Sequence, residues 1–349
     1  MTALAPLEVP TGLRQALDPA WLGHALAPVS GGRAIVSVEV AEVIRTMASK
    51  VRIAVRFEGE PAARRYCLKA FLDHEEAAAM GGVTTLREAD FYAQIAPHLS
   101  MRTPPCAAVV VDRDAGRGFI IMADLVAGGA RFSTALDPIG LDDVRETLDQ
   151  VARLHARSEL LQGRDWIPCR IETIAQRPIF SVERLQPLMH DARRGDLPAR
   201  TVDAARLLSG MQALAVRNAA RPQTLLHGDC HAGNLYWTAE GPGFADWQLI
   251  QRGNWALDVA YHVAGVLPEA IAEREERALL EHYLDALARH GGQPPGVTAA
   301  WDDYRCAQVY GYYHWAIATR VDPAITCVAF QRLGAGVTRH DTYRRLGLD

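Results

Sequence analysis

The sequence predicts an α+β protein in which a β-rich N-terminal part precedes a mainly helical C-terminal part. The chain has 349 residues, more than a single domain of ordinary size needs, so two domains or lobes are expected. β-branched residues concentrate between residues 34 and 57, whereas helical periodicity dominates after residue 129. The hydrophobic fraction of 49% and the charged fraction of 22% are ordinary for globular proteins, which argues against disorder and against a fibrous architecture.

Strands are expected in the N-terminal part, where apolar and polar residues alternate over short segments. The expected strands cover residues 35–40, 51–57, 65–71, 107–111 and 118–122. The first three are separated by short polar turns, which favours an antiparallel meander. A helix is expected over 84–95, because its apolar residues recur at helical spacing and leave Glu88 on another face.

The C-terminal part is expected to contain long helices bounded by proline or glycine. The expected helices cover residues 141–158, 201–218, 269–290 and 298–319. The first of them repeats Val144, Leu148, Val151 and Leu154 at helical spacing and is therefore expected in the core. The segment 123–128, just before Gly129, is the expected hinge between the two lobes.

Charge and cysteine usage limit the possible partners and compartments. The 37 Lys and Arg residues face 41 Asp and Glu residues, and a net charge of -4 gives no general attraction to nucleic acid or to anionic lipid. No signal peptide and no apolar run long enough to span a membrane is expected. The six cysteines never form a CxxC pair, which favours free thiols in a reducing cytoplasm.

The segment 225–248 contains most of the candidate catalytic and metal-binding residues. Apolar residues lead into and out of a loop that carries Asp229 and Asn234, and an expected hairpin returns the chain at Asp246. We therefore expect three oxygen ligands to converge. Phosphoryl transfer requires Mg²⁺ at the phosphates, and Asn234 and Asp246 are suitable ligands for this ion. Asp229 can orient the attacking hydroxyl and accept its proton.

The pattern HGDxHxxN at residues 227–234, followed by Asp246 and Asp258, resembles the kinase-like phosphotransferases. This superfamily includes aminoglycoside phosphotransferases, choline kinases and ecdysteroid kinase-like proteins. The resemblance implies a bilobal protein-kinase-like fold and an ATP- and Mg²⁺-dependent transfer of phosphate to a hydroxyl. It implies that Asp229 is the catalytic base, that Asn234 and Asp246 bind magnesium, and that Asp258 is mainly structural.

The resemblance also implies a nucleotide site in the N-terminal lobe, residues 1–122. Lys69 on the third strand and Glu88 on the following helix match the ion pair that holds the α- and β-phosphates of ATP. The hinge would bind adenine through its backbone. The residues assigned to that contact are Met122, Ala123, Asp124 and Leu125. Residues 129–349 would form the lobe that carries the catalytic loop and binds the acceptor.

Two departures from the family pattern concern nucleotide contacts. The loop expected over 45–50 has no glycine, although glycines usually let this backbone approach phosphates. A side chain of Ser49 or Lys50 could supply a contact instead, and a solvated turn is the alternative. Ala123 stands where many relatives carry a glutamate.

The acceptor is expected to be a small molecule. Only eleven residues separate Asp246 from Asp258, which is too short for an activation segment with a peptide platform. Gly228 also replaces the arginine of the HRD motif. Sterol-like alcohols, amino alcohols and antibiotics all stay open as acceptors, and so does the oligomeric state. The scarcity of acidic residues near the aromatic stretch 301–315, which offers only Asp302 and Asp303, argues against aminoglycosides.

Two other functions compete with the kinase hypothesis. His227, Asp229, His231 and Asp246 could form the metal cluster of a metallohydrolase, but this leaves Asn234 and the lysine–glutamate pair unexplained. A catalytically silent nucleotide-binding module is the second alternative.

Several side chains of the C-terminal part have expected structural roles. His231 is expected to brace the loop, and His155 is expected to pack within its helix. The aromatic residues of 301–315 belong either to the core or to the wall of an acceptor site.

Overall fold

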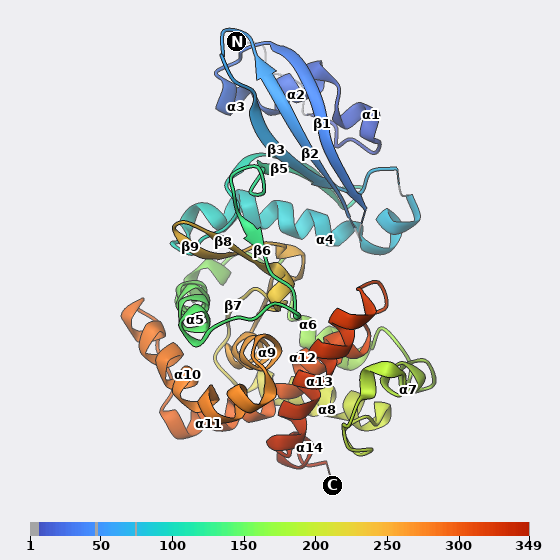
Figure 1. Cartoon of the computed structure of the whole chain (residues 1–349), viewed down its shortest axis with the longest axis vertical. Helices are drawn as coiled ribbons and strands as arrows, with labels where there is room; N and C mark the ends of the chain where they lie inside the picture. The colour runs from blue at the N-terminus through green and yellow to red at the C-terminus, as the bar shows by residue number, and fades with distance from the viewer. Residues whose placement is uncertain (1–6, 46–47, 74, 349) are drawn as a thin grey trace. The chain divides into compact units, whose positions relative to one another are not determined.

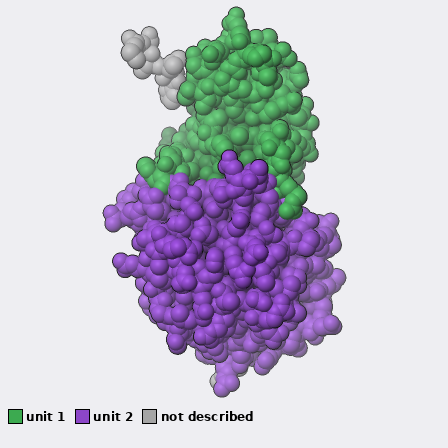
Figure 2. Space-filling model, turned by 60° about the vertical axis from the view of Figure 1, so that its left-hand side comes forward, with its two compact units in different colours: residues 1–98, 103–131, 246–249 green, residues 99–102, 132–245, 250–349 purple. Residues whose placement is uncertain are grey.

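The computed structural model describes residues 7–45, 48–73 and 75–348, and its elements are labelled in Figure 1. The chain divides into two compact units, which Figure 2 shows in different colours. Unit 1 comprises residues 1–98, 103–131 and 246–249, and unit 2 comprises the remainder. An antiparallel sheet in unit 1 and numerous helices in unit 2 confirm the predicted α+β class.

Unit 1 is built on a five-stranded sheet with the order β1-β2-β3-β5-β4. Its strands are β1 (Ile35–Arg45), β2 (Ser49–Phe57), β3 (Arg64–Ala70), β4 (Cys106–Asp112) and β5 (Arg117–Ala123). Each pair of neighbours is antiparallel, so all five predicted strands and the meander of the first three are confirmed.

The prediction of a loop over residues 45–50 is wrong at both ends. Arg45 ends β1 and pairs with Ser49, which begins β2, so Ser49 and Lys50 are strand residues. The outer part of β1 is exposed, so its sequence shows no alternation of apolar and polar residues. The pairing of β1 with β2 therefore extends beyond the segment that alternation predicts. Residues 46–47 of this expected loop lie outside the described residues.

The two faces of the sheet pack against different helices. Alternate residues of β2, β3 and β5 form one core with the helices α1 (Leu13–Ala16) and α2 (Pro19–Ala25) and with Leu26, which precedes α3 (Ala27–Ser30). Trp21 of α2, for example, meets Phe119 of β5 edge-on with ring centroids 4.9 Å apart. Because side chains alternate along a strand, Lys69 lies on the opposite face from its neighbour Leu68, which belongs to this core.

The other face of the sheet contacts α4 (Glu75–Gln94). This helix begins nine residues before its predicted start, since its first turns are rich in alanine and glutamate, which favour helix without apolar periodicity. It lies very close to β5, because a Cβ at Gly118 would overlap the Thr85 carbonyl oxygen. Glycine at 118 therefore permits the approach of helix and strand.

Unit 2 is mainly helical. Its helices are α5 (Leu141–His155), α6 (Arg170–Gln176), α7 (Val182–Met189), α8 (Ala204–Ala219), α9 (Ala256–Val266), α10 (Glu269–Arg289), α11 (Val297–Cys306), α12 (Gln308–Ala316), α13 (Pro323–Arg339) and α14 (Thr342–Arg345). Its short strands are β7 (Thr224–Leu226), which pairs with β10 (Gln251–Gly253), and the hairpin of β8 (Leu235–Thr238) and β9 (Gly241–Phe244). β6 (Arg131–Phe132) lies beside β8.

Three of the four predicted C-terminal helices are confirmed as α5, α8 and α10, and the hairpin is confirmed as β8 and β9. The single helix predicted over 298–319 is wrong, because the chain breaks at Ala307, whose ψ of -9° departs from helical geometry. No proline or glycine marks this break. None of the helices within the described residues has both the length and the hydropathy to cross a bilayer. All six cysteines are free thiols, as predicted.

Candidate active site

A buried ion pair joins the sheet and the helix of unit 1. The Nζ of Lys69 lies 2.6 Å from Oε2 of Glu88 and 3.0 Å from Oδ1 of Asp246. Lys69 and Glu88 are 1% and 0% exposed. Burial alone would lower the pKa of Lys69, but the carboxylates of Asp246 and Glu88 raise it above its usual value. The amine is therefore positively charged, and the structure brings together three of the predicted site residues.

Asp246 opens the short segment of unit 1 that follows the β8–β9 hairpin. Its φ of 65° is left-handed, a conformation that aspartate tolerates better than most residues. The next residue holds the segment in place: the Trp247 N–H donates to Oε1 of Glu88 at 3.1 Å, and its indole stacks on Phe91 with centroids 3.8 Å apart. Lys50 also lies 3.6 Å from Oδ2 of Asp246. Two lysines thus face this one carboxylate.

The predicted adenine-binding segment is held by other parts of unit 1. Met122 and Ala123 end β5, and the N–H of Ala123 donates to the Pro105 carbonyl at 2.8 Å. The side chain of Asp124 accepts from Nε of Arg52 at 3.0 Å. Leu125 follows in a turn. These contacts give Asp124 a structural role, independent of any contact between the backbone and a nucleotide.

Ser49 is not part of a solvated turn. Its side chain is buried, and its hydroxyl donates to the Leu72 carbonyl at 3.4 Å. The alternative of a solvated turn is therefore wrong for this residue. Lys50, next to it on β2, is the residue of the expected loop that contacts a predicted metal ligand, Asp246.

In unit 2, Asp229 lies in the loop after β7 and its carboxylate is held from several sides. The Tyr261 hydroxyl donates to Oδ1 at 3.1 Å, and Nδ2 of Asn234 donates to Oδ2 at 3.3 Å and to the Asp229 carbonyl at 2.9 Å. Burial alone would raise the pKa of Asp229, but the imidazole of His231 and two further histidines hold it well below the usual range. Asp229 is therefore a carboxylate at neutral pH.

His231 braces this loop, as predicted. Its Nδ1 accepts from the Gly233 N–H at 3.0 Å, while its Nε2 lies 3.5 Å from Oδ2 of Asp229. A Cβ at position 233 would come within 2.8 Å of the imidazole, so glycine lets the loop close over the ring. Asn234 then ends the 3₁₀ turn η4 (Ala232–Asn234) directly before β8.

Asp258 of α9 fixes the first residues of the loop. Its carboxylate accepts from the backbone N–H groups of His227 at 2.7 Å and Gly228 at 2.9 Å, which confirms its predicted structural role. His155 of α5 packs beside it, with Nε2 3.3 Å from Oδ2 of Asp258 and Nδ1 2.8 Å from the Tyr283 hydroxyl. His155 is a packed helix residue, as predicted, and it also orients the carboxylate that holds the loop.

Two tyrosines of this site were not predicted. Tyr261 follows Asp258 by three residues on α9, so helical spacing could have indicated that both lie near the loop. Tyr310 of α12 donates to the Gly228 carbonyl at 2.8 Å. Gly228 has a φ of 83°, which favours glycine at this turn. All four tyrosines of the stretch 301–315 are buried, which confirms for them the prediction that these aromatic residues belong to the core.

His262, next to Tyr261, connects the loop to α5. Its Nδ1 contacts the Cys230 carbonyl at 2.9 Å and its Nε2 contacts the Thr147 hydroxyl at 2.7 Å. Burial lowers the pKa of His262 to about 4. In a neutral imidazole Nδ1–H can donate to the Cys230 carbonyl, while the Thr147 hydroxyl donates to the Val144 carbonyl at 2.9 Å.

We expect His262 to make the protein less stable in mild acid. The unfolded histidine has a pKa near 6.5, so between pH 6.5 and about 4 the unfolded chain binds a proton that the folded chain excludes. The free energy of unfolding should fall as the pH falls through this window, by roughly 2–3 kcal/mol at most. Urea denaturation of wild type and His262→Asn from pH 4 to 7 measures this. Equal pH slopes for the two proteins would contradict it.

His227 does not support the alternative hypothesis of a metallohydrolase, in which it would be a metal ligand. Its Nδ1 accepts from the Asp229 N–H at 3.2 Å and its Nε2 lies 3.1 Å from the Ala245 carbonyl, so backbone groups engage both nitrogens. Within residues 7–45, 48–73 and 75–348, no group of three or more His, Cys, Asp or Glu side chains is arranged to hold a metal ion.

The fold and these residues define a kinase-like phosphotransferase. One unit is an antiparallel sheet with a buried Lys–Glu pair, and the other is a helical unit whose HGDxHxxN loop is fixed by a helical aspartate. The chain belongs to the phosphotransferase enzyme family (APH), whose model matches residues 54–301. The predicted enzyme class is thereby confirmed. Among curated protein sequences, none matches this chain significantly.

Solved structures of similar fold include two small-molecule kinases. The choline kinase LicA from Streptococcus pneumoniae is 12% identical with a TM-score of 0.51, over 91% of this chain and 98% of that one. A microcompartment-associated aminopropanol kinase is 13% identical with a TM-score of 0.52, over 90% of this chain and 94% of that one. This likeness confirms the predicted protein-kinase-like fold.

Proposed function

We propose that this enzyme transfers the γ-phosphate of ATP to a hydroxyl of a small molecule. The observation that carries the proposal is the Asp229 carboxylate, which Tyr261, Asn234 and His231 hold in a loop of the phosphotransferase family. The two solved kinases of similar fold are named for choline and aminopropanol, which are both alcohols. This supports an alcohol as the acceptor.

In this mechanism Asp229 orients the acceptor hydroxyl and takes its proton. Its low pKa makes it a weak base, which suits a loose transition state in which the proton leaves late. Tyr261 and Asn234 keep the carboxylate in one orientation, so that its position is set before the acceptor binds. Lys69, kept charged by Glu88, would hold the phosphates.

Asn234 and Asp246 carry the kind of oxygen donor that magnesium prefers. Asn234 donates through its amide nitrogen to Asp229, which fixes the rotamer in which its amide oxygen can act as a ligand. The Asp246 carboxylate faces two lysines, and phosphate groups would compete for the same cations. Asn234 and Asp246 would hold the ion, which neutralises charge on the phosphates when bound.

We expect Asp246→Asn to lose magnesium-dependent binding of ATP. Asparagine tolerates the left-handed backbone at this position, so the substitution removes the charge without adding backbone strain. Isothermal titration with ATP, with and without Mg²⁺, should show binding by wild type that needs the ion and a loss of at least tenfold in the variant. Unchanged magnesium dependence in Asp246→Asn would remove this residue from the metal site.

The proposed activity is tested by ATP consumption with Mg²⁺ and pooled alcohols, steroid alcohols, choline analogues and aminoglycosides. Acceptor-dependent turnover that vanishes in Asp229→Asn supports the kinase. A silent nucleotide-binding module is the second candidate, motivated by the absence of glycine between Arg45 and Lys50. Magnesium-dependent ATP binding without transfer to any acceptor would favour that alternative.

A further inference from the structure

A hollow beside the catalytic loop of unit 2 has a mostly apolar wall. Its volume is about 110 Å³, so it can receive only a small molecule or part of one. We call it the Trp315 pocket. The side chains that shape it are Trp315 at the end of α12, Val321, Ile325 and Ala329 on or just before α13, and Thr134 and His231.

The pocket is linked to the proposed base through His231. This imidazole lines the pocket, and its Nε2 lies 3.5 Å from Oδ2 of Asp229. Trp315 contacts the same ring edge-on, with centroids 5.4 Å apart. One side chain, His231, thus contacts both the pocket and the Asp229 carboxylate.

The lining side chains, all within the described part of unit 2, include no carboxylate, amine or guanidinium. The carboxylates nearest in sequence are engaged elsewhere. Asp137 accepts from the N–H of Thr134 at 2.7 Å and from its hydroxyl at 3.0 Å. Asp322 caps α13 by accepting from the Ala324 N–H at 2.8 Å. A cationic group buried among these lining side chains would thus lose its hydration without an anionic partner in the pocket wall, since the nearby Asp229 carboxylate lies beyond His231 and is the partner proposed for the hydroxyl.

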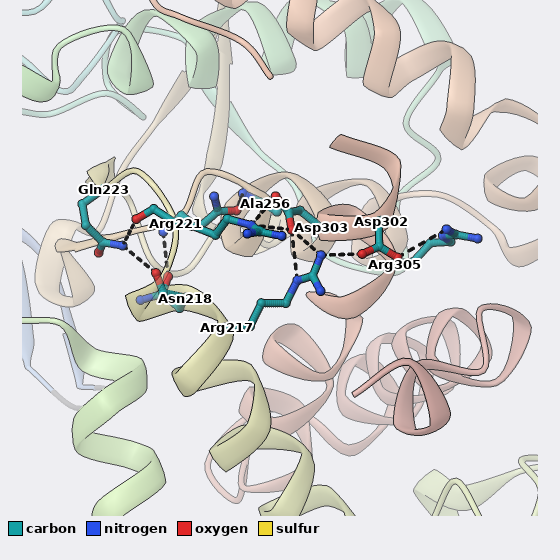
Figure 3. Close-up of polar contacts among 9 residues, drawn as sticks. Arg217, Asn218, Arg221, Gln223, Ala256, Asp302, Asp303 and Arg305 are labelled. Atoms are coloured by element: carbon teal, nitrogen blue, oxygen red, sulfur yellow. Dashed lines mark hydrogen bonds and ion pairs between the residues drawn. The ribbon is translucent and has the colours of Figure 1, made fainter. Parts of the chain in front are cut away.

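The acidic residues of α11 do not supply an anionic partner for a cationic acceptor either. Figure 3 shows that Asp302 and Asp303 face arginines. Oδ1 of Asp303 accepts from Arg217 at 2.6 Å and from Arg221 at 3.0 Å, and Asp303 is only 6% exposed. Their negative charge is already balanced, so they offer no binding site to a polycation such as an aminoglycoside.

We propose that the Trp315 pocket receives the carbon skeleton of the acceptor, and that this acceptor is an uncharged alcohol with a mostly apolar body. The inference rests on the proposed kinase function and names its substrate class. Recognition of a quaternary ammonium typically uses several aromatic faces or a carboxylate. The Trp315 pocket offers one indole, already in contact with His231. Aliphatic side chains such as Ile325 and Ala329 instead favour burial of apolar surface.

A matched pair of probes tests the charge preference. Cyclohexylmethanol and 4-piperidinemethanol have the same ring skeleton and hydroxyl, but the second carries a positive charge at neutral pH. Titration of the full chain, followed by NMR, should show at least tenfold tighter binding of cyclohexylmethanol. Equal affinity, a preference for the cation or no binding of either probe would overturn the proposal.

Ile325→Asp places a carboxylate in the pocket on a half-buried position of α13, where it can remain hydrated. The substitution should weaken the binding of cyclohexylmethanol about tenfold, and the protein should then bind 4-piperidinemethanol more tightly than cyclohexylmethanol. Val216→Asp is the control, because it also replaces a β-branched aliphatic residue by aspartate on a helix of unit 2, at a side chain that is 75% exposed and does not line the pocket. If Ile325→Asp behaved like this control, the pocket would not be the binding site.

The failure of this inference differs from the failure of the proposed function. Phosphorylation of 4-piperidinemethanol but not of cyclohexylmethanol would overturn the apolar acceptor and leave the kinase intact. Binding of cyclohexylmethanol that depends on Ile325, without ATP-dependent phosphorylation of any alcohol, would support the pocket and count against the kinase. Ala329→Phe gives an independent measurement, since it fills the pocket with an uncharged ring and should also weaken cyclohexylmethanol at least tenfold.

Discussion

Asp229→Asn should lower kcat by about 10²–10⁴-fold while ATP and Mg²⁺ still bind. The amide has nearly the shape of the carboxylate but cannot accept the proton of the acceptor hydroxyl. It also removes the negative charge that the neighbouring histidines stabilise in the folded protein. Steady-state turnover with the acceptor found by the pooled assay measures kcat, and isothermal titration measures nucleotide affinity.

Tyr261→Phe is the matched control for this experiment. It removes the hydroxyl that donates to Oδ1 of Asp229 at 3.1 Å but keeps the carboxylate and the ring packing. Because the base is still present, kcat should fall far less, by roughly tenfold. Wild-type turnover in Asp229→Asn would exclude this residue as the base. Equal losses in the two variants would mean that orientation of the carboxylate, and not proton transfer, is what Asp229 contributes.

The candidate site residues could be proposed from the sequence because the chemistry requires particular residue types at short spacings. Asp229 and Asn234 lie five residues apart in one loop, and the structure places the Asn234 amide nitrogen 3.3 Å from the Asp229 carboxylate. The role of Asp258 could also be predicted, since a carboxylate near the start of a helix can accept from nearby backbone N–H groups. Local sequence thus carries most of the information on the catalytic loop.

The groups that fix this loop from a distance could not be predicted in the same way. Tyr310 of α12 and His262 of α9 contact the loop, His155 of α5 contacts Asp258, and these contacts depend on how the helices pack. Periodicity shows that a helix has a buried face but does not show which partner that face meets. The short helices α1–α3 were missed for a related reason, because four to seven residues are too few to display a helical period.

The break at Ala307 is a second feature that periodicity in the sequence could not predict. An uninterrupted apolar pattern predicts one long helix over 298–319, yet α11 ends at Cys306 and α12 starts at Gln308. Alanine favours helix, so local propensity gives no warning of the break. Tyr310, in the first turn of α12 after the break, donates to the Gly228 carbonyl. Tertiary contacts override local preference at this position.

Lys69→Met should destabilise unit 1 by about 3 kcal/mol or more, because it leaves the Glu88 carboxyl buried without its cation. Burial already raises the pKa of Glu88 while Lys69 lowers it, so removal of the lysine should raise it further. A folded-state pKa above the unfolded value means that stability is lost as the pH rises through it. The destabilisation should therefore be larger at pH 8 than at pH 5, as measured by urea denaturation.

The double variant Lys69→Met/Glu88→Gln separates the electrostatic cost from packing. Glutamine is neutral and can still accept from the Trp247 N–H, so the double variant should regain most of the stability lost in Lys69→Met. Phosphoryl transfer should remain absent in both, since neither has the lysine that would hold the phosphates. If the double variant were as unstable as Lys69→Met at both pH values, the loss would arise from packing of the lysine stem and not from the unpaired carboxyl. Recovered stability with recovered turnover would show that Lys69 serves the fold and not the nucleotide.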